Sequence, residues 1–255
     1  MEISLIAILG AVLAIGLRIS GLMLFAPFFG NVAIPPRMKI VLVITITAAL
    51  YPVFSQRLHI GPPAQWPLLI GREMVIGIGM GLATSAVFEG ARVAGQVLSV
   101  QMGYSLVNIL DPNTAVESTV VALFHETIAM FIFLALGIHH WILRAIANSF
   151  EYLPPGAAPI NPMFTRTLLH EGAAILEVGI QLAAPVLAAT LLIDVLLALL
   201  GKASPQMPLM LLGPAVKSML GVLVLAAALN FWPRLFDRYF SQSIAYTEQV
   251  LRLAH

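Results

Sequence analysis

The amino-acid sequence predicts an all-α integral membrane protein with six to seven hydrophobic helices. Of its 255 residues, 60% are hydrophobic, and the mean hydropathy is +0.95. Only 10% are charged, whereas soluble domains contain roughly 25%. Because so few charges cannot cover a soluble globule of this size, we expect the apolar side chains to face lipid or other proteins.

The apolar residues fall into segments long enough to form helices. The sequences between them are rich in proline and glycine, such as "NVAIPPRMK" and "EYLPPGAAPINP". Proline lacks a backbone donor and restricts the residue before it, so these sequences are expected to end helices. No repeat or long charged linker divides the chain, which predicts a single domain. The apolar segments are residues 3–29, 38–54, 66–88, 91–110, 119–143, 173–200 and 209–232.

Charged residues interrupt these segments. No charge-free run exceeds 18 residues, although a membrane span needs about 20 predominantly apolar residues. A charge at the bilayer centre costs about 2.5–3.5 kcal/mol, so these side chains should face a partner helix or water, for example as pairs of Glu126 or Asp194 with Lys217. Alternatively, several lie at helix ends and reach the interface. The interrupting charges are Arg18, Arg72, Glu73, Glu126, Glu177, Asp194 and Lys217.

The two ends of the chain carry weak targeting and orientation signals. The first segment has no basic region before it and no small-x-small cleavage site after it, so we expect it to remain as a helix. Arg234, Arg238 and Arg252 follow the last apolar segment, which favours a cytoplasmic C-terminus.

The sequence lacks the residues that several classes of function require. Without cysteine, disulfides and thiolate metal sites are excluded, and no basic patch of the kind that binds nucleic acid is present. His125 and Glu126 lack the second histidine of the H-E-x-x-H zinc motif, and "GIGMG" lies inside an apolar segment. We therefore predict no catalytic, metal-binding or cofactor-binding residue, and no enzyme.

Small and polar residues line one face of the helix predicted around residue 95. Glu89, Arg92, Gln96, Ser99 and Gly103 stand at offsets of 0, 3, 7, 10 and 14, which is one face of a helix. Gly95, Ser99 and Gly103 repeat at four-residue spacing, at which small residues let two helices approach closely. This seam could contact other subunits or line a wet channel, or it could pack within the chain. Its members are Glu89, Arg92, Gly95, Gln96, Ser99 and Gly103.

A second polar row begins at Gln101 and continues through Ser105 and Asn108 at offsets of 0, 4 and 7. Polar groups on both sides of a helix do not suit lipid, so this segment should be surrounded by protein or water. Pro112 disfavours helix at Asp111, and the T-x-x-E capping box from Thr114 to Glu117 should start the next helix. The local pattern thus predicts a break at about 111–114.

The same stretch, "GARVAGQVLSVQMGYSLVNILDP", resembles the segment R-x-A-G-x-x-x-x-x-Q-M-G-x-S-x-x-x-x-x-D-P of the FliR family. This family comprises flagellar biosynthetic proteins and their counterparts in virulence type III secretion. Residues 17–47, 137–156 and 196–221 resemble other family regions in the same order, although Ser204-Pro205-Gln206 replaces an A-P-Q step. His140, Gly201 and Lys217 have no assigned place in the family pattern.

The resemblance implies a pore-forming structural subunit of the flagellar type III export gate, in the bacterial inner membrane at the flagellar basal body. Its helical hairpins would pack with FliP and FliQ subunits into a helical assembly, with FlhB and FlhA nearby and lipid around it. Residues 1–170 would form a FliP-like part and residues 171–255 a FliQ-like part. Unfolded flagellar proteins would pass through the central pore.

In that family, the segment after Q-M-G plugs the pore, which here corresponds to residues 102–118. The resemblance thus implies a plug or gate that includes Gln101, Met102, Gly103, Tyr104, Ser105, Asn108, Asp111 and Pro112. The alternatives are the homologous subunit of a virulence injectisome and a solute transporter. A transporter of the inverted-repeat type would show paired half-sequences, and none is visible.

Overall fold

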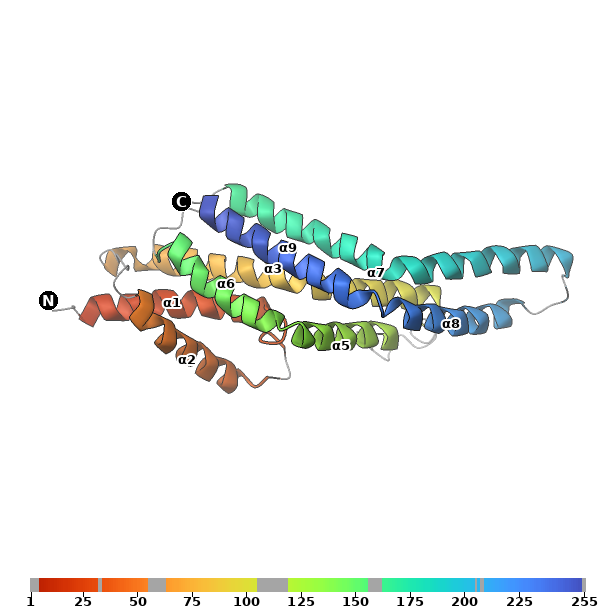
Figure 1. Cartoon of the computed structure of the whole chain (residues 1–255), viewed down its shortest axis with the longest axis horizontal. Helices are drawn as coiled ribbons and strands as arrows, with labels where there is room; N and C mark the ends of the chain where they lie inside the picture. The colour runs from red at the N-terminus through yellow and green to blue at the C-terminus, as the bar shows by residue number, and fades with distance from the viewer. Residues whose placement is uncertain are drawn as a thin grey trace. The chain divides into compact units, whose positions relative to one another are not determined.

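The computed structural model describes residues 5–31, 34–54, 63–104, 119–155, 162–204, 206 and 209–253. All regular secondary structure in these residues is helical, which confirms the predicted fold class (Figure 1). Four described helices are long and apolar enough to cross a membrane, or six spans if two broken helix pairs each count as one. The elements are α1 (Leu5–Phe25), α2 (Pro36–Phe54), η2 (Pro63–Gln65), α3 (Trp66–Gln101), α5 (Val120–Ala135), α6 (Ile138–Tyr152), α7 (Pro162–Ala203), α8 (Leu209–Ala228) and α9 (Trp232–Leu253).

Three predicted helix bounds are wrong. The segments 66–88 and 91–110 form one helix, α3, because Glu89, Gly90 and the residues after them keep helical geometry, and this helix ends at Gln101 rather than near residue 110. The segment 119–143 is divided at Gly137, whose φ of 67° is open to glycine without strain. The residues that follow the last predicted apolar segment also form a helix, α9.

Helix α5 begins with a side-chain cap. The Thr119 hydroxyl accepts a hydrogen bond from the backbone N–H of Ala122 and satisfies one of the free donors of the first turn. The predicted capping box, Thr114 to Glu117, lies outside the described residues.

The chain divides into two compact units. Unit 1 contains residues 1–86, 137–172 and 240–255. Within it, α1 packs against α2 and against the first part of α3. A Cβ atom added to Gly77 would lie 2.1 Å from the carbonyl oxygen of Arg18, and one added to Gly81 would lie 2.7 Å from that of Leu22. Glycines at four-residue spacing thus allow α1 and α3 to touch through their backbones.

Unit 2 contains residues 87–136 and 173–239. Its core joins the second part of α3 to α5 through the rings of Phe88 and Phe133, whose centroids are 5.4 Å apart. It also joins α5 to the start of α9, because the rings of His125 and Trp232 lie 4.9 Å apart. Gly95 allows α3 to approach α5, since an added Cβ would lie 2.5 Å from the Cα atom of Ala122.

Candidate functional site: the anchored end of helix α3

Helix α3 ends in a Schellman motif, in which Gly103 has a φ of +85°. The Tyr104 N–H donates to the Ser99 carbonyl at 2.9 Å, and the Gly103 N–H donates to the Val100 carbonyl at 3.1 Å. A residue with a Cβ is strained at this φ, so glycine fits the position best. The Q-M-G-Y sequence therefore ends α3.

Each residue of this motif contacts a helix of the C-terminal part of unit 2. The Gln101 side-chain amide donates to the Asp194 carboxylate on α7 at 3.1 Å. The fully buried Met102 lies against Gly221 of α8. The Tyr104 hydroxyl shares a hydrogen bond with the Ser218 hydroxyl on α8.

An ion pair between Asp194 and Lys217 links α7 to α8 at the same place. The Asp194 carboxylate thus accepts from both Lys217 and Gln101, so two cross-helix partners share its charge. The side chains of Lys217 and Asp194 are only 20% and 39% exposed. Solvent and salt therefore screen this ion pair less than they screen a fully exposed one. Gly103 lies close to Pro214, because a Cβ at Gly103 would be 3.0 Å from the proline Cβ. These contacts fix the point from which residues 105–118 depart, and we call them the α3 anchor.

The seam residues divide between two surroundings. Gly95 and Ser99 are buried, whereas Arg92 and Gln96 are exposed. Glu89 and Arg92 form the i,i+3 ion pair that their spacing predicts, with side chains 40% and 46% exposed. One side of α3 therefore packs inside unit 2, and the other presents a polar row formed by Glu89, Arg92 and Gln96.

The charged residues predicted to be buried are Glu126, Asp194 and Lys217. The pairing expected for Lys217 is made with Asp194. In the chain alone, Glu126, Asp194 and Lys217 are partly exposed rather than fully buried. Ser105, Asn108, Asp111 and Pro112 lie outside the described residues. Within the described part of the chain, no group of three His, Asp or Glu side chains could hold a metal ion.

Unit 1 contains a buried ion pair whose partners the sequence did not reveal. Arg18 of α1 and Glu73 of α3 are both 0% exposed, and the Arg18 Nε donates to Glu73 at 2.7 Å. The other guanidinium nitrogens donate to the carbonyl and hydroxyl oxygens of Ser149 and to the carbonyl of Leu153 at 2.9–3.0 Å. The Phe150 ring lies 4.2 Å from the Arg18 Cζ.

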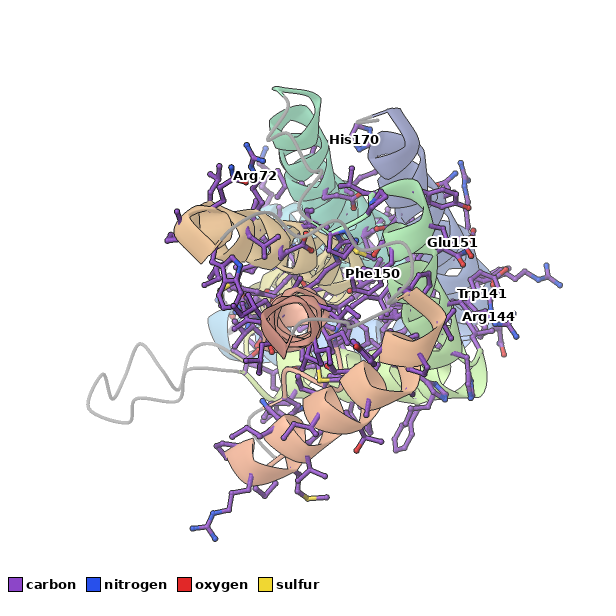
Figure 2. The ribbon with its side chains drawn as sticks, turned by 90° about the vertical axis from the view of Figure 1, so that its left-hand side faces the viewer. Arg72, Trp141, Arg144, Phe150, Glu151 and His170 are labelled. Atoms are coloured by element: carbon purple, nitrogen blue, oxygen red, sulfur yellow. The ribbon has the colours of Figure 1, made fainter. Side chains whose placement is uncertain are left out.

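This network joins α1, α3 and α6, and the pair is separated by 55 residues in sequence. Figure 2 shows Phe150 turned into the interior of unit 1, whereas Trp141 and Arg144 of the same helix point outward. Because the guanidinium donors have acceptors, the charge is tolerated inside an apolar unit. The sequence marked Arg18 and Glu73 as charges within apolar segments, but it did not identify them as partners.

A second buried carboxylate, Glu171, accepts a hydrogen bond from Ser243 at 3.1 Å, and Ser243 is also 2.8 Å from the Ala83 carbonyl. The buried charges of unit 1, Arg18, Glu73 and Glu171, are therefore compensated by protein rather than by lipid. Together with the anchor in unit 2, they define an all-helical membrane protein whose apolar helices are held in place by specific polar links.

The sequence shows the family directly. The chain belongs to the family described as bacterial export proteins, family 1, whose sequence model matches residues 9–243.

Named relatives match most of the chain. It is 30% identical over 236 residues to the flagellar biosynthetic protein FliR of Pectobacterium carotovorum, covering 92% of this chain and 90% of that protein. It is 28% identical over 234 residues to FliR of Escherichia coli, covering 89% and 87%. It is 25% identical over 203 residues to the secretion system apparatus protein SsaT of Salmonella typhimurium, covering 78% and 77%. The FliR resemblance read from the sequence is thereby confirmed.

Proposed function

We propose that this protein is a pore-forming structural subunit of the flagellar type III protein export gate. The observation that carries the proposal is the family match over residues 9–243, together with flagellar relatives that cover about nine tenths of the chain. The protein would lie in the inner membrane at the flagellar basal body and would be required for flagellum assembly. It would form part of the conduit, while partner proteins supply the energy for export.

The lengths of two helices support a place in a larger assembly. Helices α3 and α7 contain 36 and 42 residues, which correspond to about 54 and 63 Å at 1.5 Å per residue. The hydrocarbon core of a bilayer is only about 30 Å thick. A large part of each helix would therefore extend beyond the hydrocarbon unless it tilts far more than membrane helices normally do.

The apolar side chains of these helices need another cover where lipid does not reach. Leu191, Leu192 and Val195 of α7 are 57–62% exposed in this chain. Contacts with FliP and FliQ subunits would bury such surface, with FlhB and FlhA bound nearby. We assign the polar row of Glu89, Arg92 and Gln96 to the same subunit contacts, because its charges are compatible with a protein or water neighbour and not with lipid.

The proposed FliP-like and FliQ-like parts, about 1–170 and 171–255, meet inside α7, which runs without interruption from Pro162 to Ala203. The two parts would therefore share one helix. This continuity supports a single subunit that contributes both kinds of surface to the gate.

We assign the role of pore plug to residues 102–118. The support is the α3 anchor, which fixes the start of this segment through Gln101, Gly103 and Tyr104. A segment that closes a pore needs a firm attachment on at least one side. The anchor supplies that attachment through a charged hydrogen bond and close backbone packing.

A second candidate is the equivalent subunit of a virulence secretion system. The similarity to the secretion system apparatus protein of Salmonella typhimurium favours it. Genes for flagellar or for injectisome components next to the coding gene would distinguish these two functions.

Affinity purification tests the proposal. A tagged copy would be isolated from native membranes in mild detergent, and the proteins that accompany it would be identified by mass spectrometry. We expect FliP and FliQ subunits in a stable complex. Recovery of the chain alone from membranes in which those subunits are present would overturn the proposal.

A further inference from the structure

Unit 2 contains a groove between the middle of α7, the end of α8 and the start of α9. Its volume is about 650 Å³, which lies within the range of single small-molecule sites. Its walls are mainly apolar and include Leu182, Pro185, Val224, Ala227 and Trp232.

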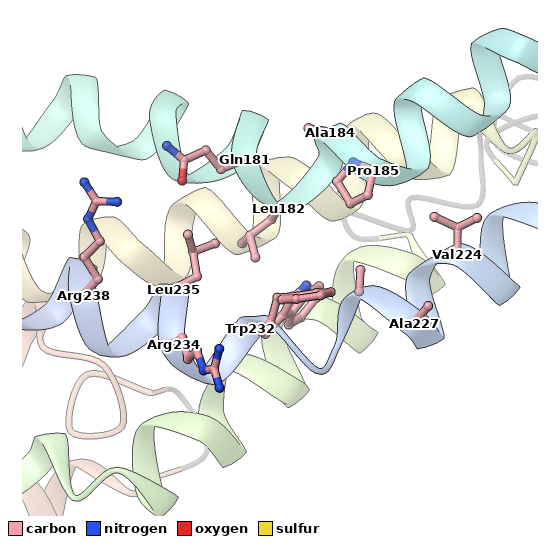
Figure 3. A pocket seen from close by; sticks show the side chains of 12 residues that line it. Gln181, Leu182, Ala184, Pro185, Val224, Ala227, Trp232, Arg234, Leu235 and Arg238 are labelled. Atoms are coloured by element: carbon pink, nitrogen blue, oxygen red, sulfur yellow. The ribbon is translucent and has the colours of Figure 1, made fainter.

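A proline inside one helix and a junction between two others lie along this groove. Pro185 lies inside α7, where it cannot donate a backbone hydrogen bond and disturbs the preceding turn. On the opposite wall, α8 ends at Ala228 and α9 begins at Trp232. Figure 3 shows Pro185 facing Trp232 and Ala227 across the groove. A small alanine side chain on each wall, Ala184 and Ala227, leaves the space unfilled.

The two ends of the groove differ in chemistry. Figure 3 shows Arg234, Arg238 and Gln181 at one end, and Val224 with Pro185 toward the other. Both arginines are exposed, and no carboxylate is among the residues that line the groove. The lining therefore carries two positive charges next to an apolar channel.

Two carboxylates lie nearby, outside the lining. Glu177 on α7 accepts hydrogen bonds from the Tyr239 hydroxyl at 2.9 Å and from the Gln181 amide at 3.3 Å. Asp237 lies on α9 between the two arginines in sequence and is exposed. Because both carboxylates lie outside the lining, the residues that bound the groove itself carry only positive charge.

We propose that this groove binds one molecule of an anionic phospholipid. The phosphate would lie at Arg234 and Arg238, whose guanidinium groups can bind it through paired hydrogen bonds. One acyl chain would follow the apolar channel past Trp232 toward Val224. Aromatic and basic residues side by side are typical of the level where lipid headgroups lie, and basic pockets between membrane helices are known to take anionic headgroups.

Native mass spectrometry of the purified full chain tests the assignment. The protein would be held in detergent with equal amounts of phosphatidylglycerol and phosphatidylcholine. We expect one tightly retained lipid, with phosphatidylglycerol favoured by at least about tenfold, since each arginine near a headgroup contributes roughly a factor of five. Arg234→Gln combined with Arg238→Gln should remove the preference, and Ala227→Trp should remove the bound lipid by filling the channel.

The matched control replaces two exposed arginines outside the groove, Arg37→Gln with Arg144→Gln, and should keep the preference of the native chain. Circular dichroism checks that each variant is folded. If the double variant is not folded, the single Arg234→Gln and Arg238→Gln variants replace it, and each should lose part of the preference. Equal retention of both lipids, or an unchanged preference in the arginine variants, would overturn the proposal. So would a photo-crosslinker at Val224 that captures a protein subunit in cells instead of lipid.

Discussion

Two glutamate–arginine pairs on α3 differ in burial and allow a matched test of what a buried charge contributes. Glu73 pairs with Arg18 with both side chains 0% exposed, whereas Glu89 pairs with Arg92 with both about half exposed. Removing one partner of a buried pair costs about 3–5 kcal/mol, because the remaining charge has no compensation. An exposed pair contributes about 0–1 kcal/mol.

We therefore expect Glu73→Gln to destabilise the protein by about 3–5 kcal/mol, and Glu89→Gln by less than about 1 kcal/mol. In a chain of this size, 1 kcal/mol corresponds to about 2–4 °C in the unfolding midpoint, so Glu73→Gln should lower Tm by about 6–20 °C. The assay is thermal unfolding in detergent micelles followed by circular dichroism. Equal shifts for the two variants would refute the reasoning, as would a Glu73→Gln midpoint within 2 °C of the native protein.

Two further predictions concern packing and the α3 anchor. Gly95→Leu should destabilise unit 2 and reduce recovery of folded protein, because its Cβ would lie 2.5 Å from the Cα atom of Ala122. The control Gly71→Leu should be tolerated, because no atom lies within 4 Å of the added Cβ. Size-exclusion chromatography of the purified variants would separate these outcomes. Asp194→Leu should lower the free energy of unfolding by about 1–3 kcal/mol, because Lys217 and the Gln101 amide both lose their acceptor. The same thermal assay measures this loss, and an unchanged midpoint would show that the anchor does not stabilise the fold.

The sequence predicted the fold class because apolar composition and proline-rich separators do not depend on tertiary contacts. It placed helix ends less well. Gly137 lies within an apolar run, so nothing local marked the break between α5 and α6. Helix α9 was overlooked because its mixture of arginine, aspartate and aromatic residues resembles a polar tail when read for hydropathy alone.

The charged residues show the same limit. A charge in an apolar helix predicts a partner but does not identify it, because the partner of Arg18 lies 55 positions away and is fixed only by how α1 and α3 pack. The sequence offered two candidate ion-pair partners for Lys217, Glu126 and Asp194. The packing of α7 on α8 brings Lys217 to Asp194. Gln101 was assigned to a helix continuing through Ser105, but the Schellman motif at Gly103 ends that helix. The glycine was visible in the sequence, whereas its left-handed backbone conformation was not.

The central proposal is that this chain forms part of a closed export pore and that residues 102–118 help to close it. Its most direct test is the ion permeability of membranes that contain the assembled gate, with residues 105–118 of this chain deleted. Assembly would be verified in the same cells by co-purification of the FliP and FliQ subunits. We expect increased leakage of ions and small solutes through the deletion gate relative to the native gate. A fully assembled deletion gate with no added permeability would contradict the assignment.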